Sequence, residues 1–324
     1  MHATISLVAF TLGCLGTLGI TPLVKRIATA AGAIDRPNAR KVHKVPTPLW
    51  GGLGVFLSLA AAILATLKIF SADITMTATN WSNLTGMLLG SLMIVLTGMW
   101  DDRYNMKAKY KLVCQIATAL VMCKFGIRIG FITSLMGSDY LFFSEWQEWV
   151  LTVFWIVGIT NAINLLDGLD GLVAGVALGS SLVFGFVSAL QGQWMVMVVM
   201  AAIAGCCLGF LRYNFNPATI FMGDTGSLLL GLNFAGWSIV GALKVTLSLT
   251  MVIPILIMAV PIFDTAFAIV RRGLARRPIF SPDKEHLHHR LLGMGMSQRQ
   301  AVVLIYGINM AFGLAGLALA YVVH

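Results

Sequence analysis

The stretch from Gln193 to Leu211 reads QWMVMVVMAAIAGCCLGFL and contains no charged residue. A helix needs about 20 apolar residues to cross the hydrocarbon core of a bilayer, so this stretch predicts a transmembrane helix. Similar apolar runs recur along nearly the whole chain. We expect ten spans, near residues 3–24, 49–69, 83–100, 109–126, 147–164, 171–190, 193–211, 227–243, 247–270 and 300–322.

The composition of the whole chain excludes a water-soluble globular fold. Of the 324 residues, 58% are hydrophobic and only 11% are charged, which is too few charges to coat a soluble surface. The segments between the spans are too short for a separate globular domain. We therefore expect an all-α polytopic membrane protein in which residues 1–324 form one domain, with a retained first span and with its chemistry on the membrane domain itself.

Lys and Arg residues are distributed unevenly between the two sides that ten alternating crossings define. All but four of the 22 fall on one side, the exceptions being Lys68, Lys124, Arg128 and Lys244. The positive-inside rule makes the richer side cytoplasmic and places both termini outside. Membrane placement also explains the net charge of +9, which therefore does not indicate binding to nucleic acid.

Polar residues collect in five segments of the predicted cytoplasmic side, 25–48, 101–111, 161–172, 212–227 and 271–299. Carboxylates at the ends of spans are costly beside hydrocarbon, so they indicate a functional site. In the second segment, Asp101 and Asp102 precede several lysines, of which Lys111 is the last. Adjacent carboxylates followed by lysines suit a site for a divalent cation and phosphates, although a short charged turn explains them equally well.

The third segment carries Asn164, Asp167 and Asp170, spaced three residues apart. On a helix they would share one face and offer converging oxygen ligands. We favour a functional role for these residues over the alternative of helix caps and interhelical hydrogen bonds. In the fourth segment, Asp224 at a helix start could hold a metal, but an N-cap is the commoner use of Asp there, and Phe221 is more typical of a packed core.

The last cytoplasmic segment contains HLHHR at residues 286–290. We expect a short helix with Ser281 as its N-cap, on which His286, His289 and Arg290 share a face and His288 points away. Zinc is disfavoured, because no cysteine is near and one helix supplies only part of a coordination shell. Contact with phosphate or sugar is favoured over a solvated basic helix.

Together these motifs resemble those of the bacterial polyprenyl-phosphate N-acetylhexosamine-1-phosphate transferases, relatives of the phospho-N-acetylmuramoyl-pentapeptide transferases. The resemblance covers essentially the whole chain. It rests on four motifs in order: Asp101-Asp102, N-A-x-N-L-x-D-G-L-D-G-L from Asn161 to Leu172, F-M-G-D-T-G-S at 221–227 and H-L-H-H-R at 286–290. Their common order along the chain makes the resemblance specific.

The resemblance implies transfer of an N-acetylhexosamine-1-phosphate from a UDP-sugar to undecaprenyl phosphate, with release of UMP. It implies a requirement for Mg²⁺, with Mn²⁺ as an alternative. The favoured group is N-acetylglucosamine-1-phosphate, at the start of a lipopolysaccharide or teichoic acid. The implied enzyme is a bundle of ten transmembrane helices in the bacterial cytoplasmic (inner) membrane, with a cytoplasmic active-site cleft open sideways to lipid, and a homodimer is left open.

The resemblance also implies roles for single residues. Asp101 and Asp102 would be catalytic, with Asp101 orienting or deprotonating the lipid phosphate. Asp224 and Asn164 would hold the metal. Contacts with nucleotide and phosphate would come from Lys111, Asp167, Asp170, Phe221 and Lys44. Contacts with sugar and phosphate would come from His286, His288, His289 and Arg290.

Two positions depart from the family pattern. Asn105 stands where some relatives have a further acid, so a third carboxylate there is not required. Leu49 stands where many bacterial relatives have Arg, which weakens any role for that turn, although His43 and Lys44 still match.

Three other functions explain part of the sequence. A muramoyl-pentapeptide donor is disfavoured, because P-x-H-H-H-F-E is absent. A secondary transporter also has intramembrane acids and broken helices, but its ionisable groups should lie near the bilayer midplane. An alcohol phosphotransferase with a CDP-linked donor is disfavoured, because the run D-G-x-x-A-R is absent.

Overall fold

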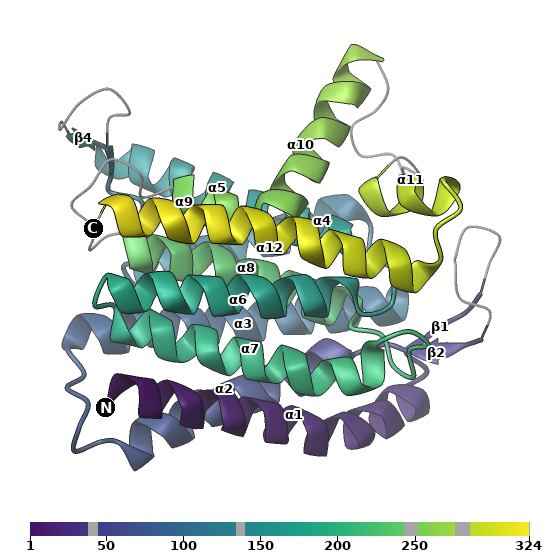
Figure 1. Ribbon diagram of the computed structural model, residues 1–324, viewed down its shortest axis with the longest axis horizontal. Helices are drawn as coiled ribbons and strands as arrows, with labels where there is room; N and C mark the ends of the chain where they lie inside the picture. Colours follow the sequence, from purple (N-terminus) through teal and green to yellow (C-terminus); the bar gives the residue numbers. More distant parts are fainter. Residues whose placement is uncertain (38–44, 134–139, 243–251, 276–285, 324) are drawn as a thin grey trace.

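The computed structural model describes residues 1–37, 45–133, 140–242, 252–275 and 286–323. Within these residues the chain forms twelve helices and two small two-stranded sheets. The long helices lie side by side in a bundle, and the start of the first and the end of the last lie at the same end of it (Figure 1). The predicted all-α fold is confirmed, with two short hairpins added.

Nine long helices make up the bundle. They are α1 (His2–Ala31), α2 (Gly51–Ile69), α3 (Ala78–Tyr104), α4 (Ala108–Lys124), α5 (Glu145–Leu166), α6 (Leu172–Leu190), α7 (Trp194–Asn214), α8 (Gly223–Ala242) and α12 (Gln298–Val323). Three shorter helices follow α8 and precede α12 along the chain, namely α9 (Val252–Ile257), α10 (Ala259–Leu274) and α11 (Leu287–Gly293). Strand β1 (Ile34–Asp35) pairs with β2 (Thr47–Pro48), and β3 (Phe131–Thr133) pairs with β4 (Tyr140–Phe142), both antiparallel.

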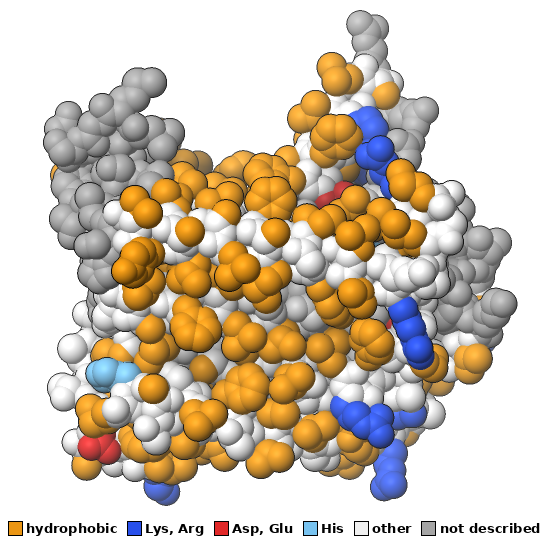
Figure 2. Space-filling view, in the orientation of Figure 1, with side chains coloured by type: hydrophobic (Ala, Val, Ile, Leu, Met, Phe, Trp, Pro, Cys, Tyr) orange, Lys and Arg blue, Asp and Glu red, His pale blue; other side chains and the backbone are white. Residues whose placement is uncertain are grey.

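Seven of the described helices, α1, α2, α3, α5, α6, α7 and α12, are long and apolar enough to cross a membrane. Helices α4 and α8 fill two more of the predicted positions, and both pack against α3 and α5. Hydrophobic side chains cover most of the face in Figure 2, while Lys and Arg gather mainly toward the end that carries β1, β2 and α11. The prediction of a polytopic membrane protein is confirmed.

The predicted ninth span, 247–270, is not one continuous helix. Its first residues lie outside the described residues, and the remainder divides at Met258 into α9 and α10. Helix α10 projects away from the bundle (Figure 1). Pro254 and Pro261 lie on either side of the break, and each lacks the backbone N–H that a continuous helix uses. The span expected at 247–270 is therefore interrupted within its described residues.

Proline also interrupts the hydrogen bonding of α1. Pro22 has no N–H to donate to the carbonyl of Leu18, four residues earlier. The hydroxyl of Tyr213, at the end of α7, donates to that carbonyl instead, at 2.8 Å. An unsatisfied carbonyl costs several kcal/mol in hydrocarbon, so this bond allows a membrane helix to contain a proline.

Helix α8 lies in the centre of the bundle, between α2, α3 and α5. Its side chains from Leu228 to Val240 are almost all buried. Side-chain signals set the start of neighbouring helices: Thr77 accepts a bond from the N–H of Asn80 in α3, and Ser144 and Gln147 form a capping box in α5. Because α8 begins where α3 and α5 end and α4 begins, four helix termini meet at one end of the bundle.

Candidate active site

A cavity of about 640 Å³ opens where these helix termini meet. Eight of the residues to which the resemblance assigns a role line it: Asp101, Asp102, Lys111, Asp167, Asp170, Phe221, Asp224 and His289. The ionisable groups thus lie at one end of the bundle and not at its middle, which is unlike the arrangement expected of a secondary transporter.

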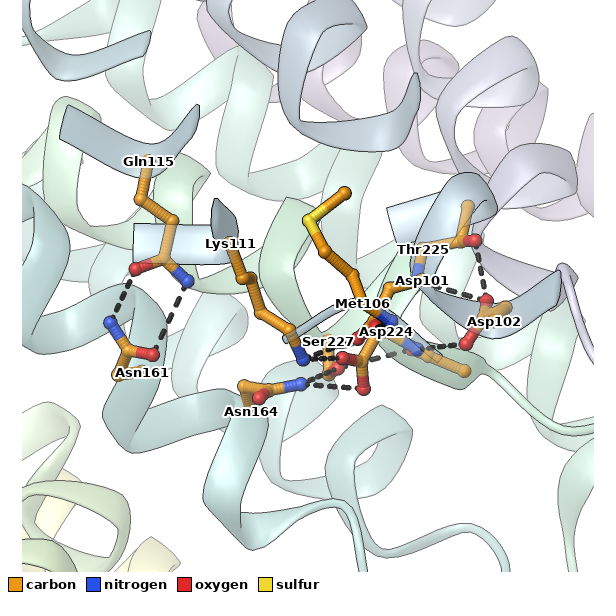
Figure 3. Close-up of polar contacts among 11 residues, drawn as sticks. Asp101, Asp102, Met106, Lys111, Gln115, Asn161, Asn164, Asp224, Thr225 and Ser227 are labelled. Atoms are coloured by element: carbon orange, nitrogen blue, oxygen red, sulfur yellow. Dashed lines mark hydrogen bonds and ion pairs between the residues drawn. The ribbon is translucent and has the colours of Figure 1, made fainter. Parts of the chain in front are cut away.

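The side chain of Lys111 lies between two carboxylates at the cavity (Figure 3). Its ammonium group forms ion pairs with Asp101 and Asp224. Asp101 lies in the last turn of α3, Lys111 in the first turn of α4 and Asp224 in the first turn of α8. Three helices therefore build one cluster in which two carboxylates share a single cation. The remaining negative charge favours a further cation beside them.

Helix α5 joins this cluster through two amide side chains. The amide nitrogen of Asn164 donates to Asp224 at 2.9 Å and to the hydroxyl of Ser227 at 2.8 Å. One turn earlier, the amides of Asn161 and Gln115 exchange hydrogen bonds of 2.6 and 3.2 Å between α5 and α4. These bonds align α4, α5 and α8, as Figure 3 shows.

Asp102 makes contacts of a different kind from those of Asp101. One of its oxygens accepts from the N–H of Asp224 at 2.8 Å, and the other accepts from the N–H of Thr225 at 3.2 Å and its hydroxyl at 2.6 Å. Both N–H groups lie in the first turn of α8, where no helical acceptor exists. Gly223 precedes them with φ 69°, and a Cβ there would overlap the Asp102 carboxylate. Asp102 thus holds the start of α8, while its predicted catalytic role stays a prediction.

The oxygen-bearing residues at the end of α5 do not share one helical face. The helix ends at Leu166, close to the predicted end of the span at residue 164, so the helical condition for a shared face is not met. Asp170 instead accepts from the amide nitrogen of Asn216 at 2.9 Å and from the N–H of Ala218 at 3.0 Å. Its carboxylate therefore shapes the connection between α7 and α8 at the edge of the cavity.

Asp167 lies just beyond the last residue of the α5 span and lines the cavity. Among the described residues, its carboxyl has no hydrogen-bond partner. Burial, together with the negative charges of Asp224, Asp102 and Asp170, raises the pKa of Asp167 well above its ordinary value. The group thus presents an oxygen that a ligand can approach.

The four polar residues of the HLHHR segment occupy different environments. His289 lines the cavity, His286 and His288 are buried, and Arg290 is exposed. The helix begins at Leu287, and the predicted N-cap segment lies outside the described residues. His288, which was expected to point away from the other three, packs beside Gly168 and contacts the rings of His286 and His289. Its burial, with the neighbouring histidines, lowers its pKa to about 4, so it is neutral at pH 7.

Phe221 lies on the wall next to the start of α2. Its N–H donates to the carbonyl of Pro48 at 2.8 Å, and its carbonyl accepts from the N–H of Gly51 at 3.0 Å. The turn from Pro48 to Gly51 brings Leu49 to the cavity lining. Leu49 is one of the two departures from the family pattern. Lys44 lies outside the described residues, so its predicted phosphate contact stays a prediction.

Two residues that take part in this architecture were missed by the sequence reasoning. Gln115 links α4 to α5, and Asp264 on α10 contacts His286 at 2.8 Å. Neither belongs to a motif that we quoted. Each is, however, a strongly polar residue within a predicted apolar span, where such residues are costly unless they are bonded. That signal alone would have found both.

Comparisons with known proteins agree with the motifs. Residues 84–242 match glycosyl transferase family 4. The chain is 42% identical to a probable undecaprenyl-phosphate N-acetylglucosaminyl 1-phosphate transferase of Bacillus subtilis, over 96% of this chain and 84% of the relative. It is 34% identical to a decaprenyl-phosphate N-acetylglucosaminephosphotransferase of Mycobacterium tuberculosis, over 90% and 77%.

A third relative is more distant. The undecaprenyl-phosphate alpha-N-acetylglucosaminyl 1-phosphate transferase of Escherichia coli is 29% identical over 87% of this chain and 75% of its own length. These similarities extend beyond the residues of the family match to nearly the whole chain. The chain therefore belongs to glycosyl transferase family 4, with the polyprenyl-phosphate N-acetylglucosaminyl 1-phosphate transferases that it resembles along most of its length.

Proposed function

We propose that this protein transfers N-acetylglucosamine-1-phosphate from UDP-N-acetylglucosamine to undecaprenyl phosphate and releases UMP. The observation that carries the proposal is the placement of Lys111 between Asp101 and Asp224, in a chain whose relatives perform this type of transfer. The Lys111 ammonium and its two carboxylates lie at one end of a membrane-spanning bundle. This place suits two phosphate-bearing substrates, one of which stays in the lipid. The product would begin a cell-envelope glycan such as lipopolysaccharide or teichoic acid.

The residues around Asp224 fit a magnesium ion. Asp224 and Asp101 supply hard carboxylate oxygens, and the bonds of Asn164 use its amide nitrogen, which leaves the amide oxygen for a metal. Among the described residues, no three His, Cys, Asp or Glu side chains form a ready metal cage. Mg²⁺ commonly takes one or two carboxylates and completes its shell with substrate phosphates and water, and Mn²⁺ would accept the same ligands.

Bound Mg²⁺ would neutralise charge on the donor diphosphate. The transfer forms a bond between a phosphate oxygen of the lipid and the sugar-bearing phosphorus, and it breaks the bond from that phosphorus to the oxygen that leaves with UMP. Lys111 would attract the phosphates, and Asp101 would orient or deprotonate the acceptor. Because the lipid phosphate is already anionic at neutral pH, positioning and charge neutralisation would supply much of the rate enhancement.

The remaining residues would hold the donor. Phe221 and Asp167 line the cavity where a nucleotide would lie, and Asp170 would shape that wall. Lys44 would contribute a phosphate contact. The sugar would meet the segment His286 to Arg290, with His289 as the residue that reaches the cavity.

We further propose that the cavity faces the cytoplasm of a bacterial cell, with both termini outside. Lys and Arg gather mainly at the cavity end in Figure 2, and the positive-inside rule gives that end to the cytoplasm. A donor nucleotide would then reach the cavity from water while the prenyl tail stays in the bilayer. A homodimer stays a prediction.

The test is UMP release by the purified full chain with undecaprenyl phosphate, Mg²⁺ and UDP-N-acetylglucosamine. We expect UMP only when lipid, metal and donor are all present, with a chelator and omission of lipid as controls. UDP-N-acetylgalactosamine and a UDP-muramoyl-pentapeptide are compared as donors, and a preference for either would change the donor but not the reaction. A protein that releases no UMP with any of these donors would overturn the proposed function.

A further inference from the structure

Both carboxylate oxygens of Asp264, on α10, form hydrogen bonds with residues at the start of α11. One oxygen lies 2.8 Å from Nδ1 of His286, and the other accepts from the N–H of Leu287 at 2.9 Å. Leu287 is the first residue of α11, so its N–H has no acceptor within the helix. The Asp264 and His286 side chains are only 12% and 6% exposed, so water competes little for these bonds. A carboxylate from another helix therefore caps α11.

The base of α10 is itself fixed to the bundle. Pro261 cannot donate to the carbonyl of Ile257, four residues earlier. The hydroxyl of Ser180 on α6 donates to this carbonyl at 2.9 Å, and the amide of Asn309 on α12 donates to the Ser180 oxygen at 2.9 Å. Asp264 follows Pro261 by three residues, within one helical turn of this anchored base. Helix α10 projects from the bundle, but its fixed base also fixes the position of Asp264.

On its other side, α11 packs against the cavity wall. The ring of His288 lies so close to Gly168, the residue after Asp167, that a Cβ at Gly168 would overlap it. Helix α11 is therefore held between α10 and the end of α5. His289, the next residue along the chain, then lies in the cavity lining, where Asp264 does not.

We propose that Asp264 is a positioning residue that sets the contact between His289 and the donor sugar. This inference rests on the proposed function and adds to it the residue that aligns α11, the helix that carries His289. Asp264 acts through α11 and touches no substrate. Its loss releases the start of α11 and moves His289, whereas Asp101, Lys111 and Asp224 keep their own bonds. Donor recognition weakens while the acceptor site is unchanged.

The experiment measures kcat and KM for both substrates in the full chain, for the wild type, Asp264→Ala and Asp264→Asn. We expect Asp264→Ala to raise the KM for UDP-N-acetylglucosamine about tenfold, the scale of a lost charged hydrogen bond, with the KM for undecaprenyl phosphate unchanged. Asp264→Asn should restore most of the donor affinity, because its carbonyl still accepts from Leu287 and its amide can donate to His286. The matched control is Thr265→Ala, which removes a buried hydroxyl that has no hydrogen-bond partner among the described residues.

A double variant separates positioning from general destabilisation. If Asp264 acts through His289, then Asp264→Ala adds little to the donor KM of His289→Ala. Three results would each overturn the positioning role and leave the proposed function standing. They are a donor KM in the double variant that equals the product of the two single effects, equal changes in the donor and acceptor KM values of Asp264→Ala, and an unchanged donor KM in an active Asp264→Ala protein. An inactive wild type would overturn the proposed function and this role with it.

Discussion

The two walls of the cavity are built in different ways. The carboxylate wall, formed by Asp101, Asp102, Lys111, Asn164 and Asp224, comes from four bundle helices whose polar groups bond to one another. The histidine wall, residues 286–290, starts at the N-cap of the seven-residue helix α11 and reaches the cavity through His289, and one carboxylate on α10 bonds to its first two residues. The comparison teaches that the groups proposed for phosphate chemistry lie on long bundle helices, whereas the groups proposed for sugar recognition lie on a short helix that is held by its contacts with α10, α12 and the end of α5.

The largest effect is expected on the carboxylate wall. Asp224→Asn removes the charge that pairs with Lys111 and that would hold a metal, so kcat should fall roughly 1,000-fold. The protein should elute from size exclusion as the wild type does. UMP release measures the loss, and Asp73→Asn, an exposed acid in another loop, is the matched control. Activity within tenfold of the wild type would remove Asp224 from the proposed chemistry.

Asp102→Ala tests whether the carboxylate wall depends on the start of α8. Asp102 satisfies two backbone N–H groups there, so its loss should lower the free energy of unfolding by about 2 kcal/mol and kcat by roughly 100-fold. The melting temperature in detergent is measured beside UMP release. A large loss of activity with an unchanged melting temperature would indicate a direct catalytic role instead.

His289→Ala probes the histidine wall. The KM for UDP-N-acetylglucosamine should rise about tenfold, the scale of one hydrogen bond to a polar ligand, while the Mg²⁺ concentration that gives half-maximal activity stays the same. The relative use of different UDP-sugars should change as well. An equal loss with every UDP-sugar, or a changed metal dependence, would contradict the separation of the two walls.

The smallest effect concerns Asp167, between the walls, and it depends on pH. Its raised pKa means that the folded protein holds a proton that the unfolded chain releases above about pH 4. Folding stability therefore falls as pH rises from that value toward the folded pKa. Asp167→Asn carries no such penalty, so it should melt higher than the wild type at pH 7.5 and by a smaller margin at pH 4.5. Melting temperatures without added metal check this, and an equal or larger margin at pH 4.5 would refute it.

How much the sequence could predict depends on the range of the interactions. The span predicted at 193–211 is found as α7, Trp194–Asn214, because apolar length is a local property. The position of Asp224 at a helix start was equally local. The course of α10 was not, because Pro261 can end, kink or begin a helix, and its neighbours in space decide which.

The same reasoning explains what was missed in the site. The bonds of Asp170 to Asn216 and of Asp264 to His286 join residues 46 and 22 positions apart, and no helical spacing relates them. Each of the four motifs thus contributed at least one residue to the cavity lining. They did not predict which of those residues face a ligand and which hold the walls in place.

The proline in α1 has a consequence for how the protein is made. During synthesis α1 enters the membrane before α7, and the carbonyl of Leu18 then lacks the donor that it has in the folded protein. Its partner, the hydroxyl of Tyr213, lies 195 residues further along the chain. Until α7 is inserted beside α1, this carbonyl must be satisfied by water or lipid headgroups, because hydrocarbon offers no donor. The hydrogen bonding of α1 is therefore completed only after α7 has been inserted.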